Sequence, residues 1–95
     1  MSIEKLVTRY ISSADHVCQT MEIVDQQATL QVSDIRKVAE AAKTYLKDAK
    51  HFMKEKRFEV SLTAVAYCEG LLDALRLLGA VRFEWPSKVE PERKR

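Results

Sequence analysis

Residues that break helices are scarce in this 95-residue sequence, which has only two glycines and two prolines. Both prolines, Pro86 and Pro91, lie close to the carboxyl end, so no proline interrupts the long stretch before them. Aromatic residues make up 7% of the chain, whereas hydrophobic residues make up 46% and charged residues 32%. This composition is typical of a globular protein, and the lack of breakers favours long helices.

The sequence also lacks an apolar run long enough to span a membrane. Its most apolar segment is uncharged only from Val60 to Cys68, about half of the roughly 20 residues that a bilayer requires. The amino terminus mixes charged with apolar residues and has no continuous apolar core like that of a signal peptide. We therefore expect no membrane contact and a cytoplasmic location.

Cysteine is rare as well. Cys18 and Cys68 each fall within an apolar helical pattern, and neither belongs to a CxxC or Cys/His spacing. We interpret both as reduced thiols in the core, and we expect no metal site and no cofactor.

Apolar residues recur every three or four positions through most of the chain, which is the period of packed helices. The first helix is expected over residues 3–28, with a heptad seam of Ile3, Val7, Tyr10, Ala14, Val17, Met21, Val24 and Ala28. The second helix is expected to begin at a Ser33-Asp34 cap, with a seam of Ile35, Val38, Ala42, Tyr45, Ala49 and Phe52. The seam loses its phase at Lys56, which predicts a turn around residues 54–57. A third helix is then expected from Phe58 to Gly79.

Residues 60–78 are apolar apart from Ser61, Thr63, Glu69, Asp73 and Arg76. In a helix the three charged residues fall on one narrow side, so we expect protein to cover nearly every other side. Small residues that favour close helix contact are Ala39, Ala42 and Ala49 in the second helix, and Ala66, Gly70 and Ala74 in the third. Gly70 costs about 1 kcal/mol relative to alanine inside a helix, which indicates a neighbouring helix or a bound partner close against it.

The period changes to two after Gly79, where Val81, Phe83 and Trp85 alternate with charged residues. Such an extended segment can fold back over the third helix. Residues 86–95 hold four basic and two acidic residues and are expected to form a flexible charged tail. We predict an all-α fold, an up-down-up bundle of three main helices with a short extended C-terminal segment, as a single domain over residues 1–85.

Charge is unevenly distributed, although the net charge is only +2. Residues 1–34 contain two basic and five acidic residues, a balance of −3, and residues 35–95 contain fourteen and nine, a balance of +5. A ridge on the second helix, away from its seam, is formed by Lys43, Lys47, Lys50 and Lys54. Such a ridge is either a solvated helix face or a contact for the phosphates of a nucleic acid.

Glu69 and Asp73 lie one helical turn apart, and Arg76 follows three residues later. Two carboxylates at this spacing can bind a hard cation or act as acid and base, which would make a small-ligand or metal pocket with Tyr67. The alternative is an ion pair of Asp73 with Arg76. We favour the ion pair, because no histidine or further acidic ligand accompanies the two carboxylates.

Arg9 and His16 have the R-x6-H spacing found in ribonucleases of the HEPN class. Both residues lie two positions past seam residues, on a face of the first helix that is expected to be exposed. We therefore interpret the spacing as a coincidence and assign no catalytic residue.

Three stretches carry a family resemblance: YLKDAKHF at residues 45–52, AVAYCEGLLDAL at residues 64–75, and the Leu78-Gly79 pair. Together they resemble an archaeal family known as domain of unknown function 357, over roughly residues 35–80. The resemblance implies a small helical bundle with no assigned activity. It also implies that Tyr67, Glu69, Gly70 and Asp73 belong to a family signature, whereas Cys68 replaces an expected small residue such as alanine.

These observations predict a non-enzymatic protein-interaction or assembly module that uses the apolar excess of the third helix, with a homodimer as one form of it. Its candidate binding surface is Tyr67, Glu69, Gly70 and Asp73. The alternative is an RNA-associated domain that binds through the lysine ridge or cuts RNA through Arg9 and His16.

Overall fold

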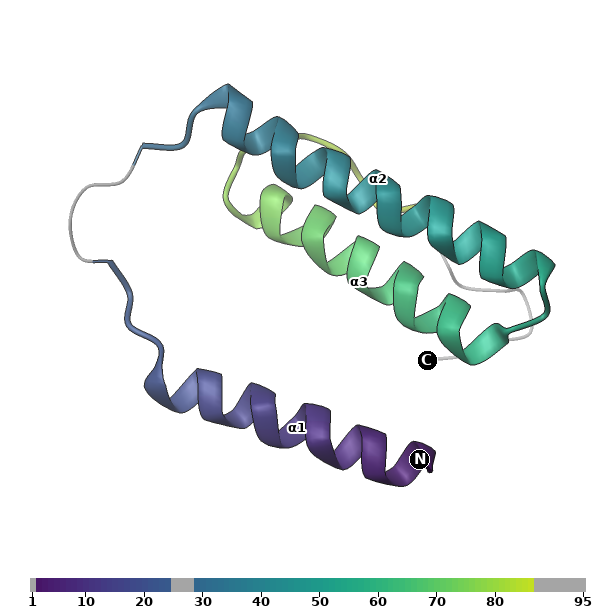
Figure 1. Cartoon of the computed structure of the whole chain (residues 1–95). Coiled ribbons are helices and arrows are strands. Elements are labelled where there is room, and N and C mark those ends of the chain that lie inside the picture. The colour runs from purple at the N-terminus through teal and green to yellow at the C-terminus, as the bar shows by residue number, and fades with distance from the viewer. Residues whose placement is uncertain (1, 25–28, 87–95) are drawn as a thin grey trace.

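The computed structural model describes residues 2–24 and 29–86, which form three α-helices. Helix α1 spans Ile3–Thr20, α2 spans Val32–Lys54 and α3 spans Phe58–Leu77, and they run up, down and up (Figure 1). No strand occurs within these two ranges. The predicted all-α, up-down-up architecture is confirmed. The predicted tail lies outside the described residues, apart from Pro86.

Helices α2 and α3 pack against each other as an antiparallel hairpin (Figure 1). The buried side chains of the described residues all belong to this hairpin and are mostly small: Ala42, Ala49, Ala64, Cys68 and Leu75. Ser61 links the two helices directly, because its hydroxyl donates a hydrogen bond of 2.7 Å to the carbonyl oxygen of Ala49. Alanine-sized side chains at the contact let the two backbones approach closely, so the core is narrow.

Both helices of the hairpin end in the same type of cap. After α2, the amide of Arg57 donates a hydrogen bond of 2.9 Å to the carbonyl of Phe52, and Lys56 between them has a left-handed φ of 61°. After α3, Gly79 occupies the equivalent position with a φ of 75°. These are Schellman caps, whose central residue must adopt a positive φ. The predicted turn and the predicted stop at Gly79 are therefore confirmed.

The helix starts were predicted with less success. Ser2 caps α1 as a helix-capping residue should, accepting a hydrogen bond of 3.1 Å from the amide of Lys5. Helix α2, however, begins at Val32, with Gln31 at its cap position and no side-chain hydrogen bond there. The predicted cap at Ser33 is wrong, since Ser33 and the following aspartate already belong to the first turn.

Helix α1 is shorter than predicted and stands apart from the hairpin. It ends at Thr20, and Met21 is extended with φ −66° and ψ 150°, so the predicted helix is wrong over residues 21–24. Residues 25–28 lie outside the described residues. No Cα atom of α1 comes within 8 Å of a Cα atom of α2 or α3. A helix without tertiary packing gains little from extension, which accounts for the early end.

The prediction that α3 is covered on nearly every side is wrong. The fully buried side chains of α3 face α2, whereas large apolar side chains elsewhere on the helix and at its end are between 38% and 77% exposed: Val60, Leu62, Tyr67, Leu77 and Leu78. The physical reason is the position of α1, which does not cover the side of α3 that α2 leaves free. None of the described helices is long and apolar enough to cross a membrane.

The small residues of α3 also lie elsewhere than predicted. Ala66, Gly70 and Ala74 are exposed, because they share a side of the helix that does not face α2. A Cβ atom added to Gly70 would meet no atom within 4 Å, so the predicted close neighbour of this glycine is absent from the described part of the chain.

The chain is extended for its size. Its Cα radius of gyration is 16.5 Å, whereas a compact chain of this length has a radius of about 12 Å.

Candidate functional site

Helix α1 presents a continuous apolar face that no other part of the described chain buries. Five residues of its predicted seam are between 48% and 66% exposed: Ile3, Val7, Tyr10, Val17 and Met21. Leu6 is the most covered residue of the helix and is only half-buried. Charged residues lie on the opposite side. Helix α1 is therefore an amphipathic helix whose apolar side is open.

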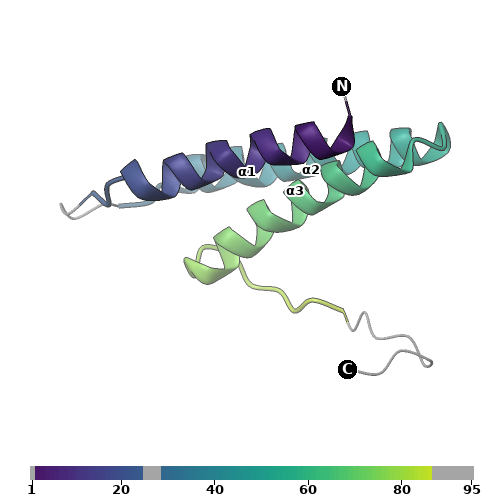
Figure 2. The ribbon, with the colours of Figure 1, turned by 90° about the horizontal axis from the view of Figure 1, so that it is seen from below.

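The first half of this face borders an open groove of about 470 Å³ between α1 and the beginning of α3. The groove is lined by Ile3, Leu6, Val7, Tyr10 and Ile11 of α1, and by Glu59, Val60 and Thr63 of α3. From their amino-terminal ends the two helices diverge (Figures 1 and 2). The second half of α1, from Ala14 to Thr20, consequently faces no residue of α3 across this groove.

The family signature on α3 separates into two parts. Tyr67 lies against Tyr45 of α2, with 4.4 Å between the ring centroids, and remains 52% exposed. Glu69, Gly70 and Asp73 instead border a shallow hollow of about 310 Å³, together with Ala66 and Trp85. The structure thus brings together three of the four predicted surface residues and places Tyr67 elsewhere.

Asp73 is held by two donors of the same chain. The indole Nε1 of Trp85 donates a hydrogen bond of 3.1 Å to Oδ1 of Asp73, and Nη2 of Arg76 lies 3.3 Å from the same oxygen. The hydrogen bond from Trp85, followed by the contacts with Arg76, holds the pKa of Asp73 below its ordinary value. The predicted ion pair of Asp73 with Arg76 is confirmed.

Trp85 reaches Asp73 because the extended segment after α3 folds back along that helix. Phe83 and Trp85 contact each other edge to face, with ring centroids 4.9 Å apart, and the guanidinium of Arg76 lies 5.8 Å from the centre of the Phe83 ring. The predicted alternation is confirmed, since Val81, Phe83 and Trp85 are partly buried and the residues between them are exposed.

No group of three histidine, cysteine, aspartate or glutamate side chains that could hold a metal occurs in residues 2–24 and 29–86. Both cysteines are free. Cys68 is buried as predicted, and burial together with the nearby carboxylate of Glu69 raises the pKa of its thiol. The prediction that Cys18 is buried is wrong, because this thiol lies exposed on the uncovered helix α1.

The lysine ridge is exposed along α2. Lys43 forms an ion pair with Glu40 at 3.3 Å. Lys47, Lys50 and Lys54 form no ion pair with any residue that the structure describes. Three ammonium groups on neighbouring turns are therefore available to an anion.

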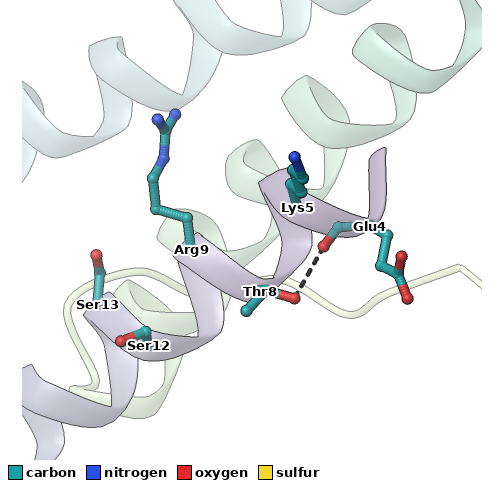
Figure 3. A pocket seen from close by; sticks show the side chains of 6 residues that line it. All are labelled: Glu4, Lys5, Thr8, Arg9, Ser12 and Ser13. Atoms are coloured by element: carbon teal, nitrogen blue, oxygen red, sulfur yellow. Dashed lines mark hydrogen bonds between the residues drawn. The ribbon is translucent and has the colours of Figure 1, made fainter. Parts of the chain in front are cut away.

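The polar side of α1 carries a hollow of about 540 Å³ that includes Arg9 (Figure 3). Its lining comes from this helix alone and consists of Glu4, Lys5, Thr8, Arg9, Ser12 and Ser13. The hydroxyl of Thr8 donates to the carbonyl oxygen of Glu4 at 2.9 Å. His16 does not line the hollow and is separated from Arg9 by about 10 Å along the helix axis. Both residues are exposed, as predicted.

No curated protein and no solved structure matches the chain. A family model matches residues 9–81, a range that includes most of α1 as well as the whole hairpin. The match is wider than the 35–80 resemblance carried by the signature, and it covers well over half of the chain. The chain therefore belongs to the family described as Protein of unknown function (DUF357).

Proposed function

We propose that this protein is a non-enzymatic protein-interaction or assembly module, and that its binding surface is the apolar face of α1. The supporting observation is an amphipathic helix of 18 residues without a single buried side chain. An isolated helix of this length is only marginally stable in water, so a partner that covers the face would account for its helical state.

The size of the apolar face is adequate for this role. Full burial of a valine, isoleucine or methionine side chain contributes about 1.5–3 kcal/mol, and each seam residue still exposes roughly half of its surface. Six such side chains, counting Ile11, therefore contribute on the order of 6 kcal/mol from one partner alone. With a matching contribution from the other side, this offsets an association cost of about 4–15 kcal/mol.

Cys18 offers a direct test, because its exposed thiol lies beside the α1 seam while Cys68 is buried. We expect a maleimide reagent to label Cys18 quickly in the dilute purified chain, and slowly after the chain is mixed with an extract of the cells that express it. A matched control is Gln19→Cys in a Cys18→Ser background, which moves the thiol to the polar side of the same helix. The control should react at the same rate in both samples.

The proposal fails if Cys18 reacts equally fast in buffer and in extract, at every chain concentration. It also fails if the Gln19→Cys control is protected as strongly as Cys18, since protection would then be unrelated to the apolar face.

We propose RNA binding through the lysine ridge as the alternative function. The observation that favours it is the row of three exposed ammonium groups without ion-pair partners, described above. Lys47→Glu with Lys50→Glu should abolish a gel shift of single-stranded RNA at low salt, whereas Lys5→Glu on α1 should not. The same incubations report RNA cleavage, which would depend on His16 if Arg9 and His16 were catalytic. A wild-type chain that neither shifts nor cuts RNA contradicts the alternative.

A further inference from the structure

We infer that the partner of α1 is a second copy of this chain, and that the two α1 helices pack antiparallel about a two-fold axis. The inference deepens the proposed function and rests on it. Three features of the molecule carry it: the spacing of the α1 seam, the sizes of its side chains, and the surface that the single chain leaves exposed.

The seam of α1 has the spacing of a helix that packs against another helix of the same kind. Its members within the helix follow one another at intervals of four, three, four and three: Ile3, Val7, Tyr10, Ala14 and Val17. Met21, four residues further on, directly follows the end of the helix. This alternation is the heptad pattern of coiled coils. No charged residue interrupts the seam, so it does not require a partner of opposite charge. A copy of itself satisfies the pattern.

The side-chain sizes select the antiparallel direction. In antiparallel register about the middle of the helix, Tyr10 of one copy stands opposite Ala14 of the other, and Val7 stands opposite Val17. A parallel pair would place Tyr10 opposite Tyr10 and Ala14 opposite Ala14, which crowds one layer and leaves a void in another. Packing large against small residues gives the denser core.

The exposed area agrees with a dimer. A stable interface of ordinary size buries about 800 Å² on each partner. Five side chains of the α1 seam are between 48% and 66% exposed, and none of the 18 residues of the helix is buried. A second copy seated along α1 therefore finds its contact area already exposed, and no rearrangement of the hairpin is needed to provide it.

The width of the face shows how α1 would contact two neighbours at once. Leu6, Ile11 and Cys18 extend the apolar side beyond the seam. The first half of α1 borders its own α3 across the open groove, and the second half faces nothing. A second α1 lying along the groove would cover the first half of this helix with its own second half. By symmetry, the first half of the second copy would cover the open second half of this helix. The interface is then isologous, as closed dimers require.

Analytical ultracentrifugation of the full chain tests the second copy. We expect a monomer–dimer equilibrium in the micromolar range. Val17→Asp should weaken it by about 100-fold or more, because two buried carboxylates would be created per dimer. Gln19→Asp places the same charge on the polar side of α1 and should leave the equilibrium within about threefold of the wild type. A wild-type chain that stays monomeric at hundreds of micromolar overturns the inference.

Disulfide trapping tests the direction and does not depend on the stability of the aspartate variant. In a Cys18→Ser background, Val7→Cys and Val17→Cys chains are oxidised separately and as a mixture. We expect cross-linked dimers only in the mixture, because position 7 of one copy meets position 17 of the other. Cross-linking of the Val7→Cys chain with itself indicates a parallel pair and overturns the proposed arrangement, as does the absence of any cross-link.

The failure of this inference can be told apart from failure of the proposed function. Protection of Cys18 that grows with the concentration of the pure chain supports the second copy. Protection that occurs only in cell extract, with a monomeric pure chain, overturns the second copy and leaves an interaction module with a different protein partner. A monomer whose solution radius of gyration is near 12 Å, with Cys18 protected at any dilution, means that α1 closes on its own hairpin and overturns both.

Discussion

At the scale of single residues, Lys56 carries the clearest backbone constraint in the hairpin. It has a φ of 61° in the turn between α2 and α3, a conformation that costs a residue with a Cβ atom about 1–2 kcal/mol. Gly79 ends α3 in the same geometry without that cost. The turn between α2 and α3 thus forms although its left-handed position holds a lysine and not a glycine, because the packing of α2 on α3 requires the chain to reverse there.

Lys56→Gly should therefore stabilise the protein. We expect the free energy of unfolding in urea to rise by about 0.5–1 kcal/mol, since relief of the left-handed strain exceeds the entropy lost by the more flexible unfolded chain. Glu55→Gly is the matched control, because φ at this position is −82° and glycine gives no relief there. The control should destabilise the protein, and an unchanged or lower stability of Lys56→Gly would contradict the assignment of strain.

Asp73 and Trp85 form the other contact that can be tested at this scale. The pKa of Asp73 is lower in the folded chain than in the unfolded one, so the contact contributes its full stability above the ordinary aspartate pKa of about 3.9. That contribution is lost as the pH falls through the lowered pKa of the folded chain. Because Trp85 is the only tryptophan, its fluorescence reports the contact directly.

We expect the fluorescence of Trp85 to stay constant from neutral pH to about pH 4 and to change at lower pH. Arg76→Gln should move this transition upward, because Arg76 also lowers the pKa of Asp73. Asp73→Asn should abolish the transition while the helices remain folded. A fluorescence change centred near neutral pH in the wild-type chain would show that another group controls the position of Trp85.

At the scale of helices, the contact between α2 and α3 depends on alanine-sized side chains. Ala49 is 5% exposed, and its carbonyl oxygen accepts the hydrogen bond from Ser61. We expect Ala49→Leu to lower the free energy of unfolding by about 1–3 kcal/mol, because the larger side chain forces the helices apart. Ala74→Leu adds the same volume at an exposed position of α3 and should change stability by less than about 0.5 kcal/mol. Equal effects of the two substitutions would contradict close packing at Ala49.

Helix α1 should depend on association for its helical state. We expect the circular dichroism signal at 222 nm to weaken when the wild-type chain is diluted below its association range. The loss should not exceed the part of the helical signal that the 18 residues of α1 contribute. Val17→Asp should show the weaker signal at all concentrations. A wild-type signal that does not change on dilution through dissociation would mean that α1 is stable by itself.

The sequence was sufficient to predict the hairpin. The seam of α2 and the loss of phase at Lys56 located the helices and the turn, because apolar periodicity directly reflects which side of a helix is buried. The seam facing α2 from the third helix was missed, although its members follow the same alternation of three and four: Ser61, Ala64, Cys68, Leu71 and Leu75. The uniformly apolar composition of that segment concealed it.

The candidate site was less predictable. An apolar seam indicates that a face needs cover, but it does not say whether the cover comes from the same chain. This is why the exposure of α1 and of Cys18 was not foreseen, and why protein was expected to cover nearly every side of the third helix apart from an apolar excess left for a partner. The contact of Trp85 with Asp73 could not be predicted from the sequence either, because it depends on the direction in which the chain leaves Gly79. The ion pair between Asp73 and Arg76 was predictable, since it joins residues only three positions apart on one helix.

At the scale of the whole molecule, the hairpin is the unit that holds tertiary structure. Among the described residues, α1 makes no close contact with the hairpin, so the hairpin should fold without α1. We expect a chain of residues 29–95 to unfold in urea with a free energy within about 0.5 kcal/mol of the full-length Val17→Asp chain, both measured as monomers. An unfolded 29–95 chain would show that α1 supports the hairpin by contacts that the extended arrangement lacks.

The short connection between α2 and α3 sets the order in which the molecule assembles. Pairing of two helices across a three-residue turn involves mostly local contacts, and proteins of low contact order fold in microseconds to milliseconds. Docking of two chains is a bimolecular step whose rate depends on concentration. After synthesis, each chain would therefore present a finished hairpin and an unoccupied helix for a period set by how soon it meets its counterpart. The abundance of the protein in the cell, more than the speed of its folding, would then decide how long the apolar surface stays exposed.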